Sequence, residues 1–442
     1  MNNIVTTNIK KFDVVISGGG LSGSLLALSL STLTKNDGQF LTIAIIEKAV
    51  SEKVQLSPEQ NQRQNQRQNQ RPNMPSLFDN RVLALSHGSA TYLKKIGVWQ
   101  TLKDDACAIT DIDVSDRGYF GKARMSAQEQ GVNALGYVVD MSLIGKAQLR
   151  LLAEKKNVYW YSANSISDID WHGDAQNTVF NADQVADNNN ITVTLNSAEQ
   201  LSTLLLLACD GAHSPCRQLA NIEVSHYDYQ QCALITNVST AKNHGNKAYE
   251  RFTEFGPIAM LPLKPSAGEQ NRCSLVWTLL PEQAQRIQLL DDDAFKLELE
   301  CAFGRWLGAI THVGKREVHP LMLLQAQQQT YHRMALIGNA SHTIHPIAGQ
   351  GFNLGLRDVA VITNLVSTAL KNEQDIGHFT LLQGYEKNRL KDHNTVIQLT
   401  DALVTLFAND LPPLVAGRNM GLSAMNFLTP LKTSLVNKTM GY

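Results

Sequence analysis

Three glycines near the N-terminus, Gly18, Gly20 and Gly23, form a GxGxxG pattern. In this pattern the first glycine permits a tight turn, the second lets a diphosphate approach the backbone, and the third lets a helix pack closely on a strand. The diphosphate then binds the unpaired amides at the helix N-terminus. Glu47 ends the next apolar run and is placed to accept hydrogen bonds from an adenosine ribose, unless it is only a solvated charge at a strand end. The pattern indicates a dinucleotide and does not distinguish NAD from FAD.

A second motif occupies residues 210–217 and follows a run of leucines. A strand that ends in Asp210 before a turn and a helix can place one carboxylate at the carboxyl edge of a sheet. The alternative is a simple Asp-Gly turn in which Ser214 caps a helix and Arg217 lies on a solvated face. The motif on its own leaves both interpretations open.

The third motif, residues 338–355, again follows an apolar strand and begins a helix. Gly349 and Gly351 would let backbone amides come close to a flat ring. The positive end of the helix would stabilise negative charge at N1 and C2=O of a reduced flavin. His342 and His345 have three-residue spacing in a loop without a nearby cysteine or carboxylate, which is poor for a metal site. We therefore predict no metal.

The elements that must position these motifs indicate an α/β fold. Residues 12–47 predict a βαβ unit, because a strand, the glycine loop, an apolar helix and a second strand follow one another. Apolar strands at 204–208 and 333–338 precede the other two motifs. Strands are predicted at 191–195 and at 233–238, and the strand-like alternation of residues 226–330 predicts a second domain built on a sheet. Further helices are predicted at 143–155, 293–307 and 352–370, and the chain from 379 onward is mainly helical.

The composition is that of an ordinary globular protein. Of 442 residues, 43% are hydrophobic and 18% are charged, and the formal net charge of −1 gives no indication of nucleic-acid binding. Six cysteines without CxxC spacing suit a reducing cytoplasm better than a disulfide framework or a zinc site. Residues 51–76 include a tract of repeated Asn, Gln and Arg, which predicts a flexible insertion. No segment approaches the roughly 18 apolar residues that cross a bilayer, so we expect a cytoplasmic protein that is at most peripheral to the inner membrane.

Taken together, the three motifs resemble those of the FAD-dependent aromatic-ring hydroxylases of the para-hydroxybenzoate hydroxylase type. That family has an N-terminal GxGxxG, a DG motif in mid-chain and a late GD motif. Asn339 stands where the general family has aspartate; its amide can still hydrogen-bond a ribityl hydroxyl, but it carries no charge. The positions that match the DG motif are Asp210, Gly211, Ser214 and Arg217, and Arg81 matches a further arginine of the family.

Within this family the chain is similar to the hydroxylases of ubiquinone biosynthesis, in particular to those that act on a 2-polyprenyl-6-methoxyphenol. The resemblance implies a Rossmann-type FAD-binding domain, interleaved with a β-sheet substrate domain and followed by a helical C-terminal region. It is carried by residues 114–118, 250–253, 256–262, 345–358 and 414–419. The expected division is 1–80, 141–225 and 331–370 for the FAD-binding domain, 81–140 for a mixed segment partly in the substrate domain, 226–330 for the substrate domain, and 371–442 for the helical region.

The resemblance also implies the chemistry. NADPH or NADH reduces FAD, the reduced flavin forms a C4a-hydroperoxide with O2, and the distal oxygen is transferred to the ring of a polyprenylated phenol. Gly349, Gln350 and Gly351 are expected to face the isoalloxazine, with Pro346 as a wall and Arg81 nearby. The remaining cofactor contacts are expected from Gly18, Gly20, Gly23, Glu47, Asp210, Gly211, Asn339 and Asn353.

Several questions stay open at this point. No general base is identified; His345 is a candidate, with a structural role as the alternative. Apolar residues between 403 and 422 can either touch a membrane or pack in the core. A flavin-free NAD dehydrogenase would explain the first motif but not the other two. A non-catalytic subunit of a ubiquinone-synthesis complex would keep the fold without turnover.

Overall fold

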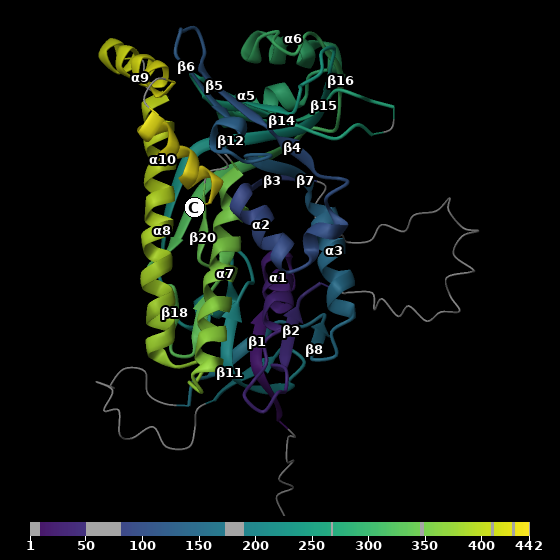
Figure 1. Cartoon of the computed structure of the whole chain (residues 1–442), viewed down its shortest axis with the longest axis vertical. Coiled ribbons are helices and arrows are strands. Elements are labelled where there is room, and N and C mark those ends of the chain that lie inside the picture. The colour runs from purple at the N-terminus through teal and green to yellow at the C-terminus, as the bar shows by residue number, and fades with distance from the viewer. Residues whose placement is uncertain are drawn as a thin grey trace, which may run out of the picture.

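The computed structural model describes residues 9–49, 81–172, 190–266, 268–344, 349–407, 411–426 and 429–441. The insertion predicted at 51–76 lies outside these residues, and so do His345 and Pro346. The described chain forms two large sheets and a small one, with helices packed against them (Figure 1).

An eight-stranded sheet carries the N-terminal βαβ unit. Its strands are β1 (Lys10–Ser17), β2 (Ile43–Glu47), β8 (Val158–Ser162), β9 (Ile166–Asp170), β10 (Ile191–Leu195), β11 (Gln200–Ala208), β18 (Thr330–Tyr331) and β19 (Met334–Leu336). The order is β18-β19-β11-β1-β2-β8, with β10 and β9 attached through β11. The strands at the centre are parallel, and Val14, Val15 and Ile16 of β1 are fully buried between β2 and β11. Burial on both faces explains the unbroken apolar runs in the sequence.

Helices cover one face of the central strands. On the other face, apolar side chains of β9, β10 and a short helix pack against the same strands. The helices are α1 (Leu21–Leu30), α2 (His87–Lys95), α3 (Met141–Ala153) and α7 (Gln350–Lys371), and the short helix is α4 (Pro215–Leu219). Because α1 packs between the sheet, α3 and α7, it is apolar on every side rather than amphipathic. Single turns of 3-10 helix lie at Val98–Thr101, Gln128–Gln130 and Gly338–Ala340.

A nine-stranded sheet forms the second layer. It contains β5 (Asp111–Asp116), β6 (Lys122–Ser126), β12 (Val224–Thr240), β13 (Lys247–Thr253), β14 (Gly256–Pro262), β15 (Arg272–Leu279), β16 (Ile310–Val313), β17 (Glu317–Ala326) and β20 (His342–Thr343). The order is β20-β17-β12-β15-β14-β13-β5-β6, with β16 beside β12. Strand β12 is longer than the predicted 233–238, because its first half is polar and pairs with β17 while remaining largely exposed. A small sheet of β3 (Val82–Ser86), β4 (Cys107–Ile109) and β7 (Gly136–Asp140) lies between the two large ones (Figure 1).

Helices α5 (Pro281–Gln288) and α6 (Asp292–Phe303) cover one face of the second sheet. The C-terminal region contains α8 (Phe379–Phe407), α9 (Pro412–Met425) and α10 (Thr429–Met440). Helix α8 runs along the first sheet and reaches the second, where Phe407 stacks on Phe252 with ring centroids 3.8 Å apart (Figure 1). None of the described helices is both long and apolar enough to cross a membrane. The predicted fold is confirmed: an α/β FAD-binding domain, an interleaved β-sheet domain and a helical C-terminal region.

Candidate active site

The glycine loop between β1 and α1 is packed against the end of β11. A Cβ atom on Gly23 would lie 1.9 Å from the carbonyl oxygen of Gly18, so only glycine fits where the helix crosses the loop. Gly18 has φ +96°, and a Cβ atom there would lie 2.5 Å from the Cys209 carbonyl oxygen. A Cβ atom on Gly20 would meet nothing within 4 Å. The space in front of the α1 N-terminus is therefore open, as a diphosphate requires.

Glu47 lies beside this loop, as the sequence predicts for a ribose-binding acid. Its Oε2 accepts a hydrogen bond of 2.6 Å from the Gly19 amide, and its Oε1 accepts one of 2.8 Å from the Ala49 amide. Each carboxylate oxygen keeps a further lone pair for a ribose hydroxyl. The contact with the ribose itself stays a prediction.

Asp210 follows β11 and lies next to the end of β1. Its Oδ2 accepts hydrogen bonds of 3.2 Å from the Ser17 hydroxyl and of 3.2 Å from the Cys216 amide. Its Oδ1 is buried and accepts no hydrogen bond from the described part of the chain. A buried carboxylate oxygen without a donor is costly, and a hydroxyl of a bound dinucleotide would satisfy it.

Ser214 and Arg217 connect the second motif to the third. The Ser214 hydroxyl accepts a 3.0 Å hydrogen bond from the Arg217 amide, so its predicted role as a helix cap is confirmed. The alternative placement of Arg217 on a solvated face is wrong. Its side chain is buried and donates 2.7 Å hydrogen bonds to the carbonyl oxygens of Ala340 and Ala212. It therefore fixes the distance between the DG motif and the turn at 338–340.

The N-terminus of α7 is fixed to β3. Gly349 adopts φ +61°, and a Cβ atom there would lie 2.9 Å from the Cβ of Ala84. The Asn353 side chain accepts a 2.9 Å hydrogen bond from the Ser86 amide and donates to the carbonyl oxygens of Ala84 at 2.8 Å and Gly349 at 2.7 Å. Asn353 thus holds the turn that presents the first amides of α7, while its predicted contact with the cofactor stays untested.

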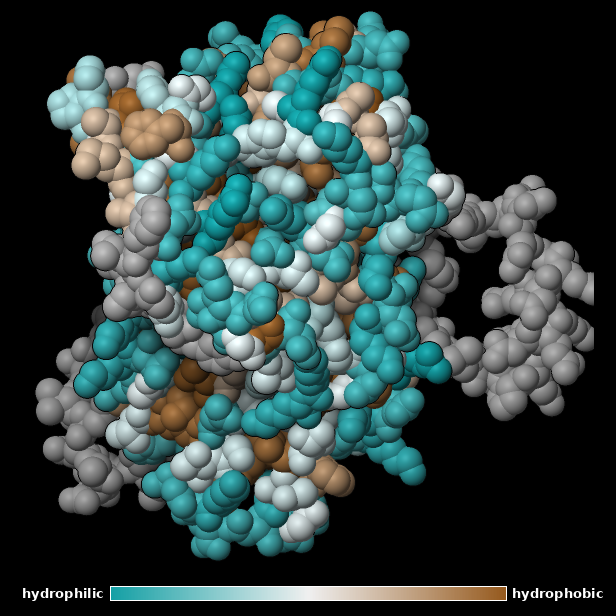
Figure 2. All heavy atoms as spheres, turned by 45° about the horizontal axis from the view of Figure 1, so that its top comes forward, coloured by the Kyte–Doolittle hydropathy of each residue, from teal (hydrophilic) through white to brown (hydrophobic). Residues whose placement is uncertain are grey.

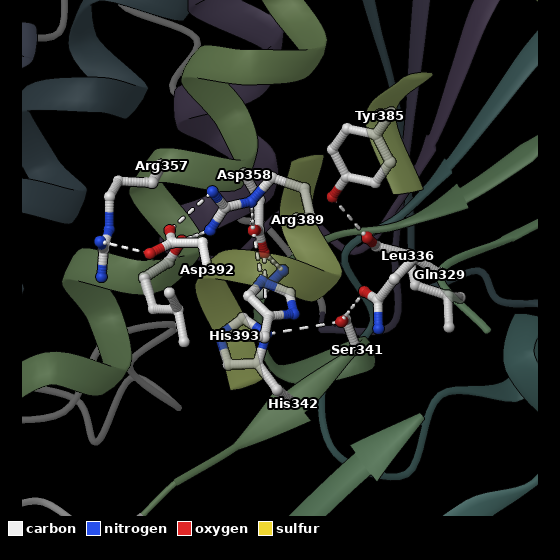
Figure 3. A network of polar contacts seen from close by, with 12 residues as sticks. Gln329, Leu336, Ser341, His342, Arg357, Asp358, Tyr385, Arg389, Asp392 and His393 are labelled. Carbon is white, nitrogen blue, oxygen red and sulfur yellow. Dashed lines mark hydrogen bonds and ion pairs between the residues drawn. The ribbon is translucent and has the colours of Figure 1, made fainter. Parts of the chain in front are cut away.

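A buried polar network lies behind the third motif (Figure 3). Asp358 of α7 accepts hydrogen bonds from the Gly338 amide at 2.9 Å, from Arg389 Nε at 2.6 Å and from His393 Nε2 at 2.8 Å. Although burial opposes ionisation, the neighbouring His393 and Arg389 hold the pKa of Asp358 below its usual range. The carboxylate therefore stays charged and anchors the turn that begins at Gly338.

His342 belongs to the same network, and this bears on the prediction of no metal. Among the described residues, His342, Asp358 and His393 are the one group whose ligand atoms lie within 4.8 Å of one another. Burial and the neighbouring His393 lower the pKa of His342 to about 3, so its imidazole is neutral. The Arg389 guanidinium, however, already occupies Asp358, and a cation beside it would be repelled. The prediction of no metal stays a prediction.

One cavity of about 1160 Å³ joins these elements. Its lining does not include Gly18, Gly23, Glu47 or Asp210; Glu47 and Asp210 are half-buried, at the end of β2 and just after β11. Its lining includes many of the predicted cofactor residues, namely Gly20, Arg81, Gly211, Asn339, Gly349, Gln350, Gly351 and Asn353.

The cavity continues beyond the motifs into an apolar half. The second sheet and the C-terminal helices supply this half, which the motif analysis did not find. Its signal in the sequence is the alternation in β13, where Ala248, Glu250 and Phe252 point to one side and line the cavity. The C-terminal helices add Leu399, Leu403, Phe407, Leu422, Val436 and Met440.

Comparisons with known proteins identify the family. A family model described as an FAD binding domain matches residues 159–400. The ubiquinone hydroxylase UbiL of Rhodospirillum rubrum is 32% identical over 435 residues, which cover 98% of this chain and 90% of the relative. The chain belongs to this family of FAD-dependent hydroxylases. The mitochondrial ubiquinone biosynthesis monooxygenase COQ6 of Caenorhabditis elegans is a further family member, 29% identical over 96% of this chain and 95% of the relative.

Two solved structures share the fold. The p-nitrophenol 4-monooxygenase PnpA of Pseudomonas putida has a TM-score of 0.70 at 16% identity, covering 98% of this chain and 99% of the other. Klebsiella pneumoniae HpxO, solved with FAD and uric acid, has a TM-score of 0.66 at 13% identity, covering 99% of each chain. The family resemblance predicted from the motifs is confirmed, and the chain is an FAD-dependent monooxygenase rather than a flavin-free dehydrogenase.

The residues present fit FAD. The open space at Gly20 suits the diphosphate, and the unsatisfied Oδ1 of Asp210 suits a hydroxyl group. The cavity runs from the α1 N-terminus to the α7 N-terminus and is large enough for a flavin ring and a second ligand. The amides at Gln350 and Gly351, at the positive end of α7, would face the negative edge of a reduced ring.

Proposed function

We propose that this hydroxylase adds oxygen to the ring of a polyprenylated phenol in ubiquinone biosynthesis. The single observation that carries the proposal is the apolar half of the cavity, which continues directly from the residues that fit FAD. The phenol ring would lie between the second sheet and the α7 N-terminus. The prenyl tail would extend between that sheet and the apolar side chains of the C-terminal helices.

The protein's own contribution is to bind, orient and exclude water. FAD, when bound, supplies the redox chemistry that activates O2, with NADPH or NADH as the reductant. Gln350 and Gly351 would hold the ring system, and Asn339 and Asp210 would bind the ribityl and diphosphate side of the cofactor. Arg81 lines the cavity next to β3 and would face the flavin. The apolar lining keeps water from the reacting atoms, which favours transfer of oxygen to the substrate.

A first experiment is to assay the FAD-loaded protein with 2-prenyl-6-methoxyphenol and either NADPH or NADH. We expect substrate-dependent oxidation of the nicotinamide and a product with one added oxygen atom, identified by mass spectrometry. Each buried CH2 of the tail contributes about 0.8 kcal/mol, so a phenol with two prenyl units should show a KM at least about tenfold lower than one with a single unit. Equal KM values for tailed and tailless phenols would contradict the proposed tail site. A protein that binds FAD but never oxidises NAD(P)H would favour an accessory subunit of a ubiquinone-synthesis complex.

We also propose peripheral contact with the inner membrane through α9. Phe407 and Leu422 are buried, as core packing predicts, but Leu411 and Leu414 are 60% and 40% exposed. Met420 adds a third exposed apolar side chain, and Figure 2 shows apolar surface on the projecting α9. A tail too apolar for water would be delivered most directly from a lipid surface.

Liposome co-sedimentation tests this contact. We expect the wild type to sediment with vesicles and Leu414→Ser/Met420→Ser to stay largely in the supernatant with unchanged FAD content. Leu289→Ser, which removes an 85% exposed leucine at the end of α5, is the matched control and should sediment normally. A wild type that never sediments with vesicles would contradict membrane contact.

A further inference from the structure

A single row of side chains crosses the cavity face of the second sheet. Cross-strand pairs join Val114 to both Ala123 and Glu250, and join Ala259 to both Glu250 and Val276. Val276 pairs in turn with Ile235 of β12. All six side chains line the cavity. Five of them are aliphatic, and the sixth, near the centre of the row, is a carboxylate.

The Glu250 carboxylate makes no hydrogen bond or ion pair with any residue that the structure describes. Its neighbours in β13 point to the opposite face, where Tyr249 packs on Phe303 and the Arg251 guanidinium lies 4.8 Å from the Trp306 ring. Within the described residues, no group donates a hydrogen bond to the Glu250 side chain or forms an ion pair with it. An unpartnered carboxylate in apolar surroundings costs stability, so its retention in the wall of a ligand cavity indicates that the ligand supplies the missing donor.

We propose that Glu250 is the general base that accepts the proton of the substrate's phenol hydroxyl. The inference rests on the proposed function and names the base that the motifs did not reveal. In this step the phenol O–H bond breaks, the proton moves to a carboxylate oxygen of Glu250, and the bonding electron pair stays on the phenolate oxygen. The products are a neutral Glu250 and a phenolate, whose ring is more electron-rich and accepts electrophilic oxygen more readily.

The chemistry of the substrate calls for such a base. A free phenol has a pKa of about 10, so only about one molecule in a thousand is ionised at pH 7. General bases are most effective when their own pKa is close to the working pH. Burial alone raises the pKa of Glu250 to about 7. The charged groups that share the cavity lining come from other elements and are Arg81, Arg357, Lys391, Asp392 and Lys438.

The pH dependence follows from this assignment. Glu250 must be ionised to accept a proton, so kcat/KM should fall as the pH drops below about 7. In Glu250→Gln we expect kcat/KM at pH 7 to fall by about 100-fold or more, and the acid limb near pH 7 to disappear. The remaining activity should rise with pH toward the pKa of the phenol itself. Glu250→Asp, which keeps a carboxylate, should keep the acid limb.

The matched control is Asp113→Asn. Asp113 lies on β5, next to β13, but faces the opposite side of the sheet, where it pairs with Lys247 at 3.3 Å and Arg124 at 3.6 Å. This variant removes a carboxylate from the same sheet without touching the cavity. It should keep both the wild-type rate and the wild-type pH profile.

A rescue experiment distinguishes a base from a residue that only shapes the cavity. A prenylated phenol carrying fluorine atoms that lower its pKa is already ionised near pH 7, so it should restore most of the activity of Glu250→Gln. The methyl ether of the phenol, which has no proton to donate, should bind wild type and Glu250→Gln with equal dissociation constants. A variant that keeps the wild-type pH profile, or that is not rescued by the acidic phenol, would overturn the inference. If the wild type turns over no phenol at all, the proposed function fails and the inference fails with it.

Discussion

At the scale of single residues, substitutions of Gly20 and Gly23 should have different effects: the first should weaken FAD binding and the second should lower folding stability. Gly23→Ala would place a Cβ atom 1.9 Å from the Gly18 carbonyl oxygen, and backbone must move to relieve that contact. We expect a loss of at least about 2 kcal/mol in the free energy of unfolding of the apoprotein, measured by urea denaturation.

The Cβ atom of Gly20→Ala would meet no protein atom within 4 Å, so the apoprotein of this variant should unfold as the wild type does. Its dissociation constant for FAD, followed by flavin fluorescence, should rise by about tenfold or more. Unchanged FAD binding in Gly20→Ala would place the diphosphate elsewhere.

Single residues also show what local sequence can and cannot predict. The glycines, Glu47 and Asp210 were found because each follows an apolar strand at a spacing that physics constrains locally. For Arg217 the sequence also allowed a position on a solvated face, which is wrong. Its burial depends on a hydrogen bond to the carbonyl oxygen of Ala340, which is far away in the sequence. The sequence could not identify Glu250 as a candidate base. Its aliphatic neighbours come from five other strands, and the sequence does not show that these strands lie side by side.

At the scale of elements, the start of α7 depends on one side chain from the helix itself. Asn353→Ala would remove three hydrogen bonds to β3 and to the Gly349 turn, of which the one from the Ser86 amide is buried. Leaving the Ser86 amide without an acceptor should cost about 1–3 kcal/mol in the free energy of unfolding. FAD affinity should fall as well, because the amides at Gln350 and Gly351 lose their fixed position. Asn364→Ala, on the exposed face of the same helix, is the control and should change neither quantity. Normal FAD affinity in Asn353→Ala would show that the turn keeps its shape without this side chain.

The elements that the sequence predicted best are those whose own residues form a clear apolar pattern. The βαβ unit, β10 and α7 agree with the predicted ranges because each carries a strong apolar pattern within its own sequence. Strand β12 was predicted too short, since its exposed first half has a polar pattern and is held by β17. Strands β5 and β6 were not predicted, because they pair with β13 from a remote part of the chain.

At the scale of the whole molecule, α9 is tied to the second sheet by a buried ion pair. Arg418 Nε lies 2.7 Å from Asp116 Oδ2, both side chains are almost fully buried, and Asn419 Nδ2 donates to the same oxygen at 3.0 Å. These residues belong to two of the segments that carried the family resemblance. Asp116→Ala would leave the Arg418 charge buried, and we expect a loss of about 3–5 kcal/mol in the free energy of unfolding.

Controls for this ion pair are available in the same chain. Asp116→Ala/Arg418→Met removes both charges and should lose less stability than Asp116→Ala alone. Glu317→Gln breaks an exposed pair with Lys315 and should change the free energy of unfolding by less than about 1 kcal/mol. Equal losses in the single and double Asp116 variants would show that the buried charge of Arg418 is not the cause.

The hydrogen bond from Arg217 to Ala340 has a consequence for biosynthesis. The proposed cofactor site would unite the loop at 18–23, the turn at 210–217 and the helix that begins at Gln350, and α9 and α10 line the apolar half of the cavity. A ribosome-bound chain therefore lacks part of the flavin pocket until most of its length has been translated. With this site, FAD would be captured only after α7 has been synthesised, and it would not template the folding of the preceding elements. Translation products truncated before α7 should therefore lack flavin.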